Sequence, residues 1–227
     1  MLMRILPGIF AWFMFSLQAH AVDLASLSNK DVIAGLKEAL SQSSRAAVAK
    51  LGVKNGFLGN QRVKIPLPDK LQKIDGAMRK FGLGKYSDEV IVSMNRAAEA
   101  AVPEAENLLL AAVKKMSIQD AKGILTGGED AATQYFRRNT ESQLRAKFLP
   151  IVTKTVRQVG AVEKYNEFTG KASALGLTDP PKLEPYVTQK ALDGLFLIMK
   201  DEEKAIRSNP ADYSGKLLKK VFGAVAR

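Results

Sequence analysis

Apolar residues recur at every third or fourth position along nearly the whole chain, and strict alternation of apolar and polar residues is almost absent. The spacing is clear in Val32, Leu36 and Leu40, and again in Leu217 and Val221. It places the apolar side chains on one face of an α-helix, whereas a half-buried strand needs a period of two. The sequence therefore predicts an all-α protein, folded as an irregular single-domain helical bundle.

Capping signals predict where several helices begin and end. Ser28 and Ser117 are each followed three residues later by an aspartate, as in a capping box. Ser87 and Thr140 are also interpreted as N-caps, and Gly52 as the end of the first helix.

Prolines interrupt the predicted helices. Pro150 is expected to kink its helix, and Pro103 either kinks a helix or begins a new one. Two prolines in the segment 61–68 exclude a helix there, so this segment is expected to lie extended over the core. After a break at Asn209-Pro210, residues 213–227 are predicted to form a C-terminal amphipathic helix.

The segment 1–21 has the organisation of a secretory signal peptide. Arg4 precedes the apolar run 5–17, and the segment ends in Ala-His-Ala, which fits an A-x-A cleavage site. The alternative is a retained membrane anchor, but the run is shorter than the roughly 20 residues that span a bilayer. We expect the mature chain, residues 22–227, to be periplasmic or alternatively secreted, with no transmembrane span.

The residue composition excludes several kinds of catalysis. Histidine occurs only at position 20, within the predicted leader, and cysteine is absent. The mature chain therefore lacks a Ser-His-Asp triad, a thiol nucleophile and the usual ligands of zinc. It also has no Walker A motif and no dinucleotide-binding glycine motif. Carboxylate chemistry, Ser-Lys pairs and oxygen-ligand sites remain, and we predict no cofactor and no metal site.

Acidic residues are the candidates for a hydrolase of cell-wall glycans, because glycoside hydrolysis needs only two carboxylates at a fixed separation. The candidates lie around Pro103 and after a pair of glycines: Glu99, Glu104, Glu106, Glu129 and Asp130. Acids in the first turn of a helix also complement the helix dipole. The sequence favours this structural role, and it assigns no catalytic residue.

The densest group of polar residues is a candidate binding site. Its members are Thr126, Gly127, Gly128, Asp130, Tyr135, Arg137 and Arg138. Two glycines before a helix start can turn backbone N–H groups toward an anion, with an arginine assisting. The alternative is that one glycine ends the preceding helix in the left-handed conformation. The acidic residues at the helix start would repel an anion, which favours the second interpretation.

The formal net charge of +11 is unevenly distributed. Segments 61–85 and 137–171 are basic, whereas 86–130 is acidic. Outside the cytoplasm such a basic excess is expected to meet anionic envelope lipids or an envelope protein, and no nucleic acid. The alternative is a solvated surface that only keeps the protein soluble.

The predicted C-terminal helix combines an apolar face with lysines, which makes it a candidate contact with a membrane or a partner. The contact residues would be Lys216, Lys219, Lys220 and Phe222. A terminal helix of this pattern more often closes the domain core, and this alternative is favoured.

Five stretches carry a family resemblance. They are KIPLP (64–68), AAEAAVPEA (97–105), MSIQDAKGILTGGEDAATQYFRR (116–138), KFLPIV (147–152) and YVTQKALDGLF (186–196). Together they resemble the bacterial family called domain of unknown function 4197. The resemblance implies an exported helical protein with no assigned activity and no catalytic set to carry over.

These observations predict a non-enzymatic periplasmic binding or interaction protein that acts at an anionic envelope surface. One alternative is the carboxylate-dependent hydrolase of cell-wall glycans. Another is a periplasmic chaperone-like protein, which would expose a contiguous apolar patch larger than about 600 Å². The alanine-rich helix faces indicate close helix packing, so we expect no large ligand pocket.

Overall fold

The computed structural model describes residues 28–176 and 179–225, and the predicted signal peptide lies outside this part. Every regular element in these residues is a helix, which confirms the predicted fold class. The helices are α1 (Asn29–Leu51), α2 (Asp69–Lys80), α3 (Gly84–Ala101), η2 (Val102–Glu104), α4 (Ala105–Lys115), α5 (Ile118–Thr126), α6 (Ala131–Gln158), α7 (Ala161–Ser173), α8 (Leu183–Ser208), η3 (Pro210–Asp212) and α9 (Lys216–Val225).

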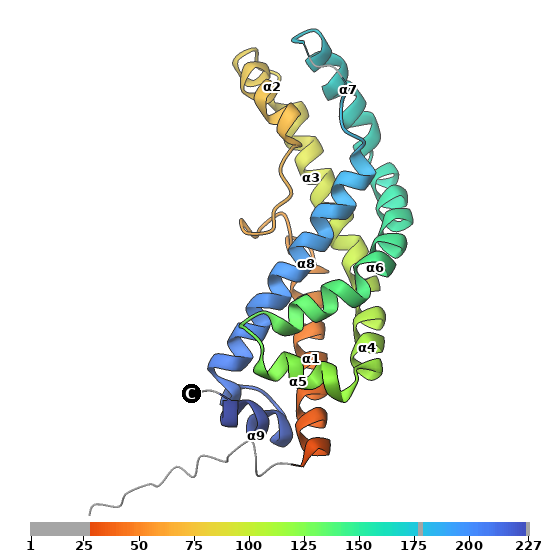
Figure 1. Ribbon diagram of the computed structural model, residues 1–227. Coiled ribbons are helices and arrows are strands. Elements are labelled where there is room, and N and C mark those ends of the chain that lie inside the picture. Colours follow the sequence, from red (N-terminus) through yellow and green to blue (C-terminus); the bar gives the residue numbers. More distant parts are fainter. Residues whose placement is uncertain (1–27, 177–178, 226–227) are drawn as a thin grey trace, which may run out of the picture.

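The molecule is elongated, and α8 runs along much of its length (Figure 1). Helices α1, α4, α5 and α9 gather at one end, while α2 and α7 form the other. The long helices α6 and α8 pack on each other, and α3 packs against both of them and against α7. The buried apolar side chains form one hydrophobic core along this axis.

Two of the predicted helix starts are confirmed. The Ser28 side chain accepts a hydrogen bond from the N–H of Asp31, and Ser117 forms a reciprocal capping box with Asp120. The other two are wrong. Ser87 lies inside α3, where its hydroxyl donates to the carbonyl of Gly84, and Thr140 lies inside α6, donating to the carbonyl of Phe136. Each hydroxyl is satisfied by its own helix, so neither begins a new one.

The two central prolines act differently. Pro103 lies in the 3-10 helix η2, which separates α3 from α4. Pro150 lies inside the 28-residue helix α6, which continues past it to Gln158 and bends along its length (Figure 1). Because proline has no N–H and its ring crowds the preceding turn, a bend lets the helix continue past it.

Residues 52–68, named here the strap, connect α1 to α2 without regular secondary structure. They include the segment 61–68, which has no helix, as predicted. Four of their apolar side chains are buried: Phe57, Val63, Ile65 and Leu67. Asn95 of α3 binds both backbone groups of Ile65, accepting from its N–H at 2.8 Å and donating to its carbonyl at 2.9 Å. Tyr186 of α8 donates to the carbonyl of Pro66 at 2.9 Å. An irregular segment is thus buried without losing its hydrogen bonds.

Helix α9 packs closely on α1 at Gly35. A Cβ atom built at Gly35 would lie 2.6 Å from the carbonyl oxygen of Leu217 and 2.8 Å from Cγ2 of Val221. Both are closer than real Cβ atoms approach their neighbours. Because Gly35 has no side chain, the backbones of α1 and α9 can pack in direct contact.

We expect Gly35→Leu to displace α9 from α1 and to lower the free energy of unfolding by about 1–3 kcal/mol, because overpacking forces the backbones apart. Urea denaturation measures the loss, and limited proteolysis in 209–215 should become faster. Gly76→Leu is the matched control, since a Cβ there meets nothing within 4 Å. Unchanged stability and proteolysis in Gly35→Leu would contradict this docking of α9.

Candidate functional site

A hollow of about 360 Å³ lies where α5 meets the first turns of α6. A second hollow, of about 290 Å³, lies between α4 and α6. Asp120 and Tyr135 line both, so the two hollows adjoin at these side chains. We name the pair the Tyr135 groove. Its size falls at the lower end of ordinary small-ligand sites.

Tyr135 and Asp120 form the fixed wall between the two hollows. The Tyr135 ring is buried, and its hydroxyl donates to the carbonyl of Ala112 at 3.2 Å. Burial, followed by the charge of Asp120, raises the pKa of this hydroxyl, so it remains a hydrogen-bond donor at neutral pH. Hydrogen bonds from the Ser117 side chain and backbone N–H lower the pKa of Asp120. The Asp120 carboxylate is therefore charged and is already used in the capping box.

The remaining lining combines small residues with amides and cations. Ala111, Ala112 and Gly123 leave space, and a Cβ at Gly123 would meet nothing within 4 Å. The polar side chains at the rim are Lys115, Gln119, Gln134, Arg138, Asn139 and Gln143. Arg138 is exposed and forms no ion pair with another residue of the described chain. Amides both donate and accept hydrogen bonds, and a guanidinium binds carboxylate or phosphate through two N–H groups.

The predicted anion site at the double glycine is occupied from within the protein. The first N–H groups of α6, those of Ala132 and Thr133, each donate to the Glu203 carboxylate at 2.9 Å. The Thr133 hydroxyl donates to it as well, and Arg207 pairs with it at 2.9 Å. The positive end of α6 is therefore neutralised by a buried side chain of α8, and no external anion can use it.

Gly127 ends α5, as the favoured interpretation predicts, but the left-handed conformation predicted for the glycine is wrong. Gly127 is extended, with φ −81° and ψ 177°, and Gly128 does not have a positive φ either. A Cβ at Gly127 would lie 2.6 Å from the carbonyl oxygen of Gly123 and 2.7 Å from Cβ of Ala131. A glycine is therefore needed at position 127 because α5 and α6 approach each other closely there. It is not needed for a left-handed backbone conformation.

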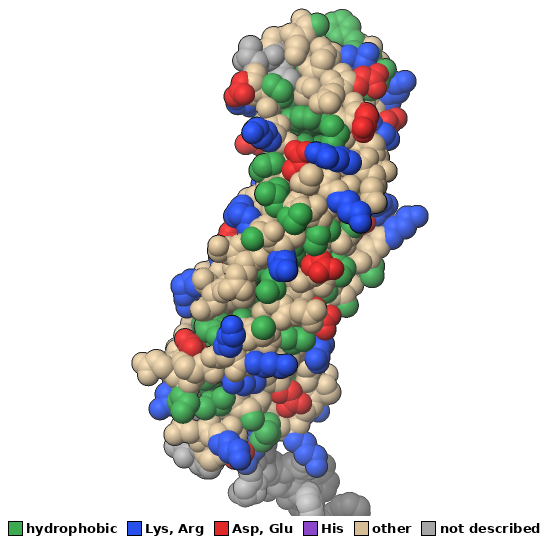
Figure 2. Space-filling model, turned by 90° about the vertical axis from the view of Figure 1, so that its right-hand side faces the viewer, with side chains coloured by type: hydrophobic (Ala, Val, Ile, Leu, Met, Phe, Trp, Pro, Cys, Tyr) green, Lys and Arg blue, Asp and Glu red, His purple; other side chains and the backbone are tan. Residues whose placement is uncertain are grey.

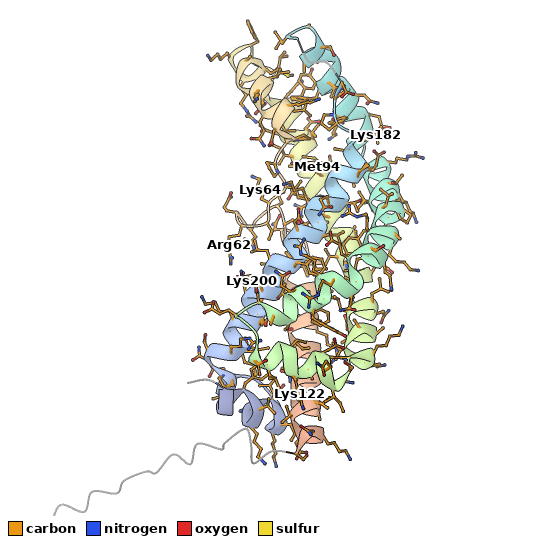
Figure 3. All side chains as sticks on the ribbon, in the orientation of Figure 1. Arg62, Lys64, Met94, Lys122, Lys182 and Lys200 are labelled. Carbon is orange, nitrogen blue, oxygen red and sulfur yellow. The ribbon has the colours of Figure 1, made fainter. Side chains whose placement is uncertain are left out.

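Lysines of α8 hold the loop that joins α5 to α6. Lys200 pairs with Asp130 at 3.0 Å, and Lys204 pairs with Glu129 at 3.3 Å. Lys200 extends from α8 beside this loop (Figure 3). Its hydrogen bond lowers the pKa of Asp130, so the contribution of this pair to stability is present at neutral pH and is lost as the pH falls through the lowered pKa.

The structure divides the predicted binding residues. Tyr135 and Arg138 line the Tyr135 groove. Arg137 faces α8 instead, with its guanidinium 4.7 Å from the Phe196 ring centroid and 3.7 Å from Asp193. Thr126 is exposed and donates to the carbonyl of Lys122 within its own helix. The groove residues that sequence reasoning missed follow helical spacing, as in Gln134 and Arg138 or Tyr135 and Asn139.

The acids considered for hydrolysis are almost all engaged. Glu99 is buried and accepts from the N–H groups of Phe57 and Leu58, both at 3.1 Å, and from Arg96 at 2.5 Å. Glu106 lies 3.4 Å from Arg45. Glu129 and Asp130 are held by the lysines of α8, and Glu104 is simply exposed. Within the described ranges, no three acidic, histidine or cysteine side chains are grouped so that they could hold a metal ion.

The C-terminal helix begins at Lys216 and not near Tyr213. Its apolar residues Leu218, Val221 and Phe222 are buried in the core. Phe222 is therefore not available to a membrane or a partner, which corrects that part of the predicted contact and favours the core-closing alternative. Lys216, Lys219 and Lys220 are exposed. Of the helices that the structure describes, none has the length and apolarity needed to cross a bilayer.

The comparisons with known proteins bear on the family alone. No curated protein and no solved structure shows significant similarity to this chain. A family model described as "Protein of unknown function (DUF4197)" matches residues 26–223. This range contains the strap, the Tyr135 groove and almost all of α9. The chain therefore belongs to the DUF4197 family of proteins of unknown function.

Proposed function

We propose that this protein is a non-enzymatic binding protein of the bacterial cell envelope and that the Tyr135 groove holds an acidic, hydrogen-bonding ligand. The observation that carries the proposal is the make-up of the groove rim. Four amide side chains and two cations surround a floor of small residues. The one carboxylate among the lining residues, Asp120, accepts hydrogen bonds from Ser117 and forms no ion pair within 4 Å with the cations of the rim. The charge of Arg138 acts on it from farther away and is the smallest of the causes that lower its pKa.

The chemistry of the rim defines the ligand class. Gln119, Gln134 and Gln143 suit hydroxyl or amide groups, which both donate and accept. Arg138 and Lys115 add positive charge, and Arg138 offers the planar fork that carboxylates and phosphates bind. The signal-peptide pattern at the N-terminus supports delivery to the envelope, where acidic glycans of the wall and of lipopolysaccharide carry all these groups.

The surface charge supports an anionic partner. Figure 2 shows the face formed by α4, α6 and α7, on which Lys and Arg side chains are distributed over the whole length, with hydrophobic side chains and some Asp and Glu side chains between them. Helix α6 alone carries Arg137, Arg138, Arg145, Lys147, Lys154 and Arg157 against the single acid Glu141. Such a face attracts polyanions to the molecule before any specific contact forms.

Engagement of the candidate acids supports a role without catalysis. A general acid of a glycosidase needs a raised pKa in a cleft that also holds a second carboxylate. The two aspartates with displaced pKa values, Asp120 and Asp130, are both lowered. Incubation of the protein with isolated cell-wall sacculi is therefore expected to release no soluble glycan fragments, and sustained release would contradict the proposal.

The decisive experiment fills the groove without disturbing the fold. We expect Gly123→Leu to weaken binding to isolated sacculi or to lipopolysaccharide at least about tenfold, because the new side chain occupies the larger hollow. Co-sedimentation with each polymer, measured separately, identifies which of the two is bound. Both Gly123 and the control Gly170→Leu are helical glycines whose Cβ would meet nothing within 4 Å. Each replacement should stabilise its helix slightly, since glycine costs about 1 kcal/mol in a helix.

Arg138→Ala tests the charge of the same site. Loss of a charge-assisted contact is expected to weaken binding about tenfold. Arg157→Ala removes the same charge from an exposed position of α6 outside the groove and should change affinity little. Equal affinity of Gly123→Leu, Arg138→Ala and the parent protein for both polymers would overturn the assignment of the groove.

A further inference from the structure

Phe81 differs from every other phenylalanine of the described residues. Six of the seven are at most 3% exposed: Phe57, Phe136, Phe148, Phe168, Phe196 and Phe222. Phe81 is 70% exposed. Transfer of a phenylalanine side chain out of water is favourable, and in this fold Phe81 does not gain that free energy.

The exposure of Phe81 is fixed by an ordered turn. Phe81 follows the last residue of α2, and Gly82 has the left-handed φ of 73° that reverses the chain into α3. The N–H groups of Gly82 and Leu83 bind the carbonyls of Arg79 and Met78, each at 3.0 Å. The ring is therefore presented at the end of a helix by a hydrogen-bonded turn.

A second apolar side chain is exposed at the same end of the molecule. Leu175 follows the C-terminus of α7 and is 41% exposed. Figure 1 shows that α2 and α7 both reach this end, far from α1 and α9. We name it the distal tip: Phe81 and Leu175, with the neighbouring cations Lys80, Lys85 and Lys171.

Two cations of the distal tip, Lys85 and Lys171, lie over one aromatic ring. The ammonium groups of Lys85 and Lys171 lie 4.9 Å and 4.7 Å from the Tyr86 ring centroid. Tyr86 is in the first turn of α3, close in the chain to Phe81. That turn has no acidic residue and no side-chain cap. Two positive charges from different helices are thus held together beside the exposed phenylalanine.

The acids near the distal tip are matched by other cations. Arg79 binds Asp75 at 2.8 Å and Asp88 at 2.5 Å, and Lys164 binds Glu89 at 3.1 Å. Glu167 pairs with Lys171 of the tip itself, but at 4.0 Å and with both side chains partly exposed, so this contact is weak. Within the described ranges, Lys80 and Lys85 have no carboxylate partner, so the tip keeps a positive surface.

We infer that the distal tip docks on an anionic lipid bilayer, with Phe81 and Leu175 in the interfacial region and Lys85 and Lys171 against lipid phosphates. The apolar side chains stand on two separate helix ends among cations, whereas a protein partner would be met by a continuous apolar groove. Insertion of an aromatic side chain combined with attraction of lysines to anionic lipid is the usual energetic basis of peripheral binding. The contact uses none of the residues of the Tyr135 groove and goes beyond the proposed function.

The test is flotation of the protein, as processed by the producing bacterium, with vesicles of phosphatidylglycerol and phosphatidylcholine or of phosphatidylcholine alone. We expect binding to the anionic vesicles that weakens with salt. Phe81→Ser is expected to weaken it about tenfold, and the double variant Lys85→Ala/Lys171→Ala by a similar factor. Ile118→Ser is the matched control, because Ile118 is a 55% exposed apolar residue on α5, at the other end of the molecule.

Tryptophan fluorescence can show directly whether the distal tip enters the bilayer. The single Trp of the sequence, Trp12, lies in the predicted leader, so Phe81→Trp gives the processed chain its only indole. We expect its emission to shift to the blue with anionic vesicles, while Ile118→Trp does not shift. Gly123→Leu should bind vesicles like the parent protein, which separates failure of this inference from failure of the groove assignment.

Two results would overturn the inference. One is that Phe81→Ser and the parent protein float equally with anionic vesicles, or that neither floats. The other is that the parent protein forms dimers in sedimentation velocity that Phe81→Ser abolishes, since a second copy of the chain would then cover the tip.

Discussion

Glu203→Ala is expected to lower the free energy of unfolding by about 3–5 kcal/mol, the typical cost of breaking a buried ion pair. The Glu203 side chain is 4% exposed, and its carboxylate accepts from the N–H groups of Ala132 and Thr133. Its removal leaves the two N–H groups without this acceptor and uncovers the positive end of α6. It also takes the carboxylate from the half-buried Arg207 guanidinium, which keeps its hydrogen bond to the Ile124 carbonyl. Urea denaturation followed by circular dichroism measures the loss.

The control variant for Glu203→Ala replaces another acid near the start of α6. Glu129→Ala also removes an acid near the start of α6, but its side chain is exposed, so the change should stay within about 0.5 kcal/mol. Glu203→Gln keeps one acceptor oxygen and should fall between the two. A loss below about 1 kcal/mol in Glu203→Ala would show that α6 does not depend on this carboxylate.

Phe57→Ala has the second large expected effect, a loss of about 3–5 kcal/mol. The Phe57 ring is fully buried and lies over Gly194 of α8, where an added Cβ would come within 2.6 Å of ring atom Cε1. Glycine at this position of α8 gives the ring its space, so truncation leaves a cavity between the strap and the helix. Thermal or urea denaturation should show the loss, and trypsin should cleave the strap faster at Lys54 and Arg62.

Val53→Ala provides the comparison for Phe57, since Val53 is an exposed residue at the start of the strap and should matter little. Resistance of the strap to trypsin in Phe57→Ala would mean that Asn95, Tyr186 and Glu99 hold it without the ring. Their hydrogen bonds would then be the main cause of its order.

The sequence predicts the fold class and many helix boundaries because these depend on neighbours in the chain. Periodicity fixes which face of each helix is buried, and the capping boxes at Ser28 and Ser117 involve residues three apart. The N-cap predictions at Ser87 and Thr140 are wrong because a hydroxyl inside a helix can also donate to a carbonyl three or four residues earlier, as both do here. Packing against α3, α4 and α8 keeps α6 helical through Thr140 and Pro150, and local signals do not contain that information.

Only some residues of the candidate site could be predicted from the sequence, because the rest depend on helix orientation and on contacts distant in the chain. Arg137 and Arg138 are adjacent in the sequence, but neighbouring residues of a helix point about 100° apart. One therefore faces α8 and the other the groove. Glu203, which takes the anion position at the start of α6, is 71 residues away from Ala132 in the chain. Only the tertiary fold brings it there.

The length of α8 has a consequence for a protein that would be seated by its distal tip. A helix of 26 residues extends for about 39 Å at 1.5 Å per residue, and Lys200, which holds the loop beside the groove, lies toward its far end. A tip resting on lipid would keep the Tyr135 groove at a height comparable to the thickness of the bilayer itself. The elongated molecule would then act as a spacer that holds the Tyr135 groove away from the lipid headgroups, where it could bind polymers outside the bilayer.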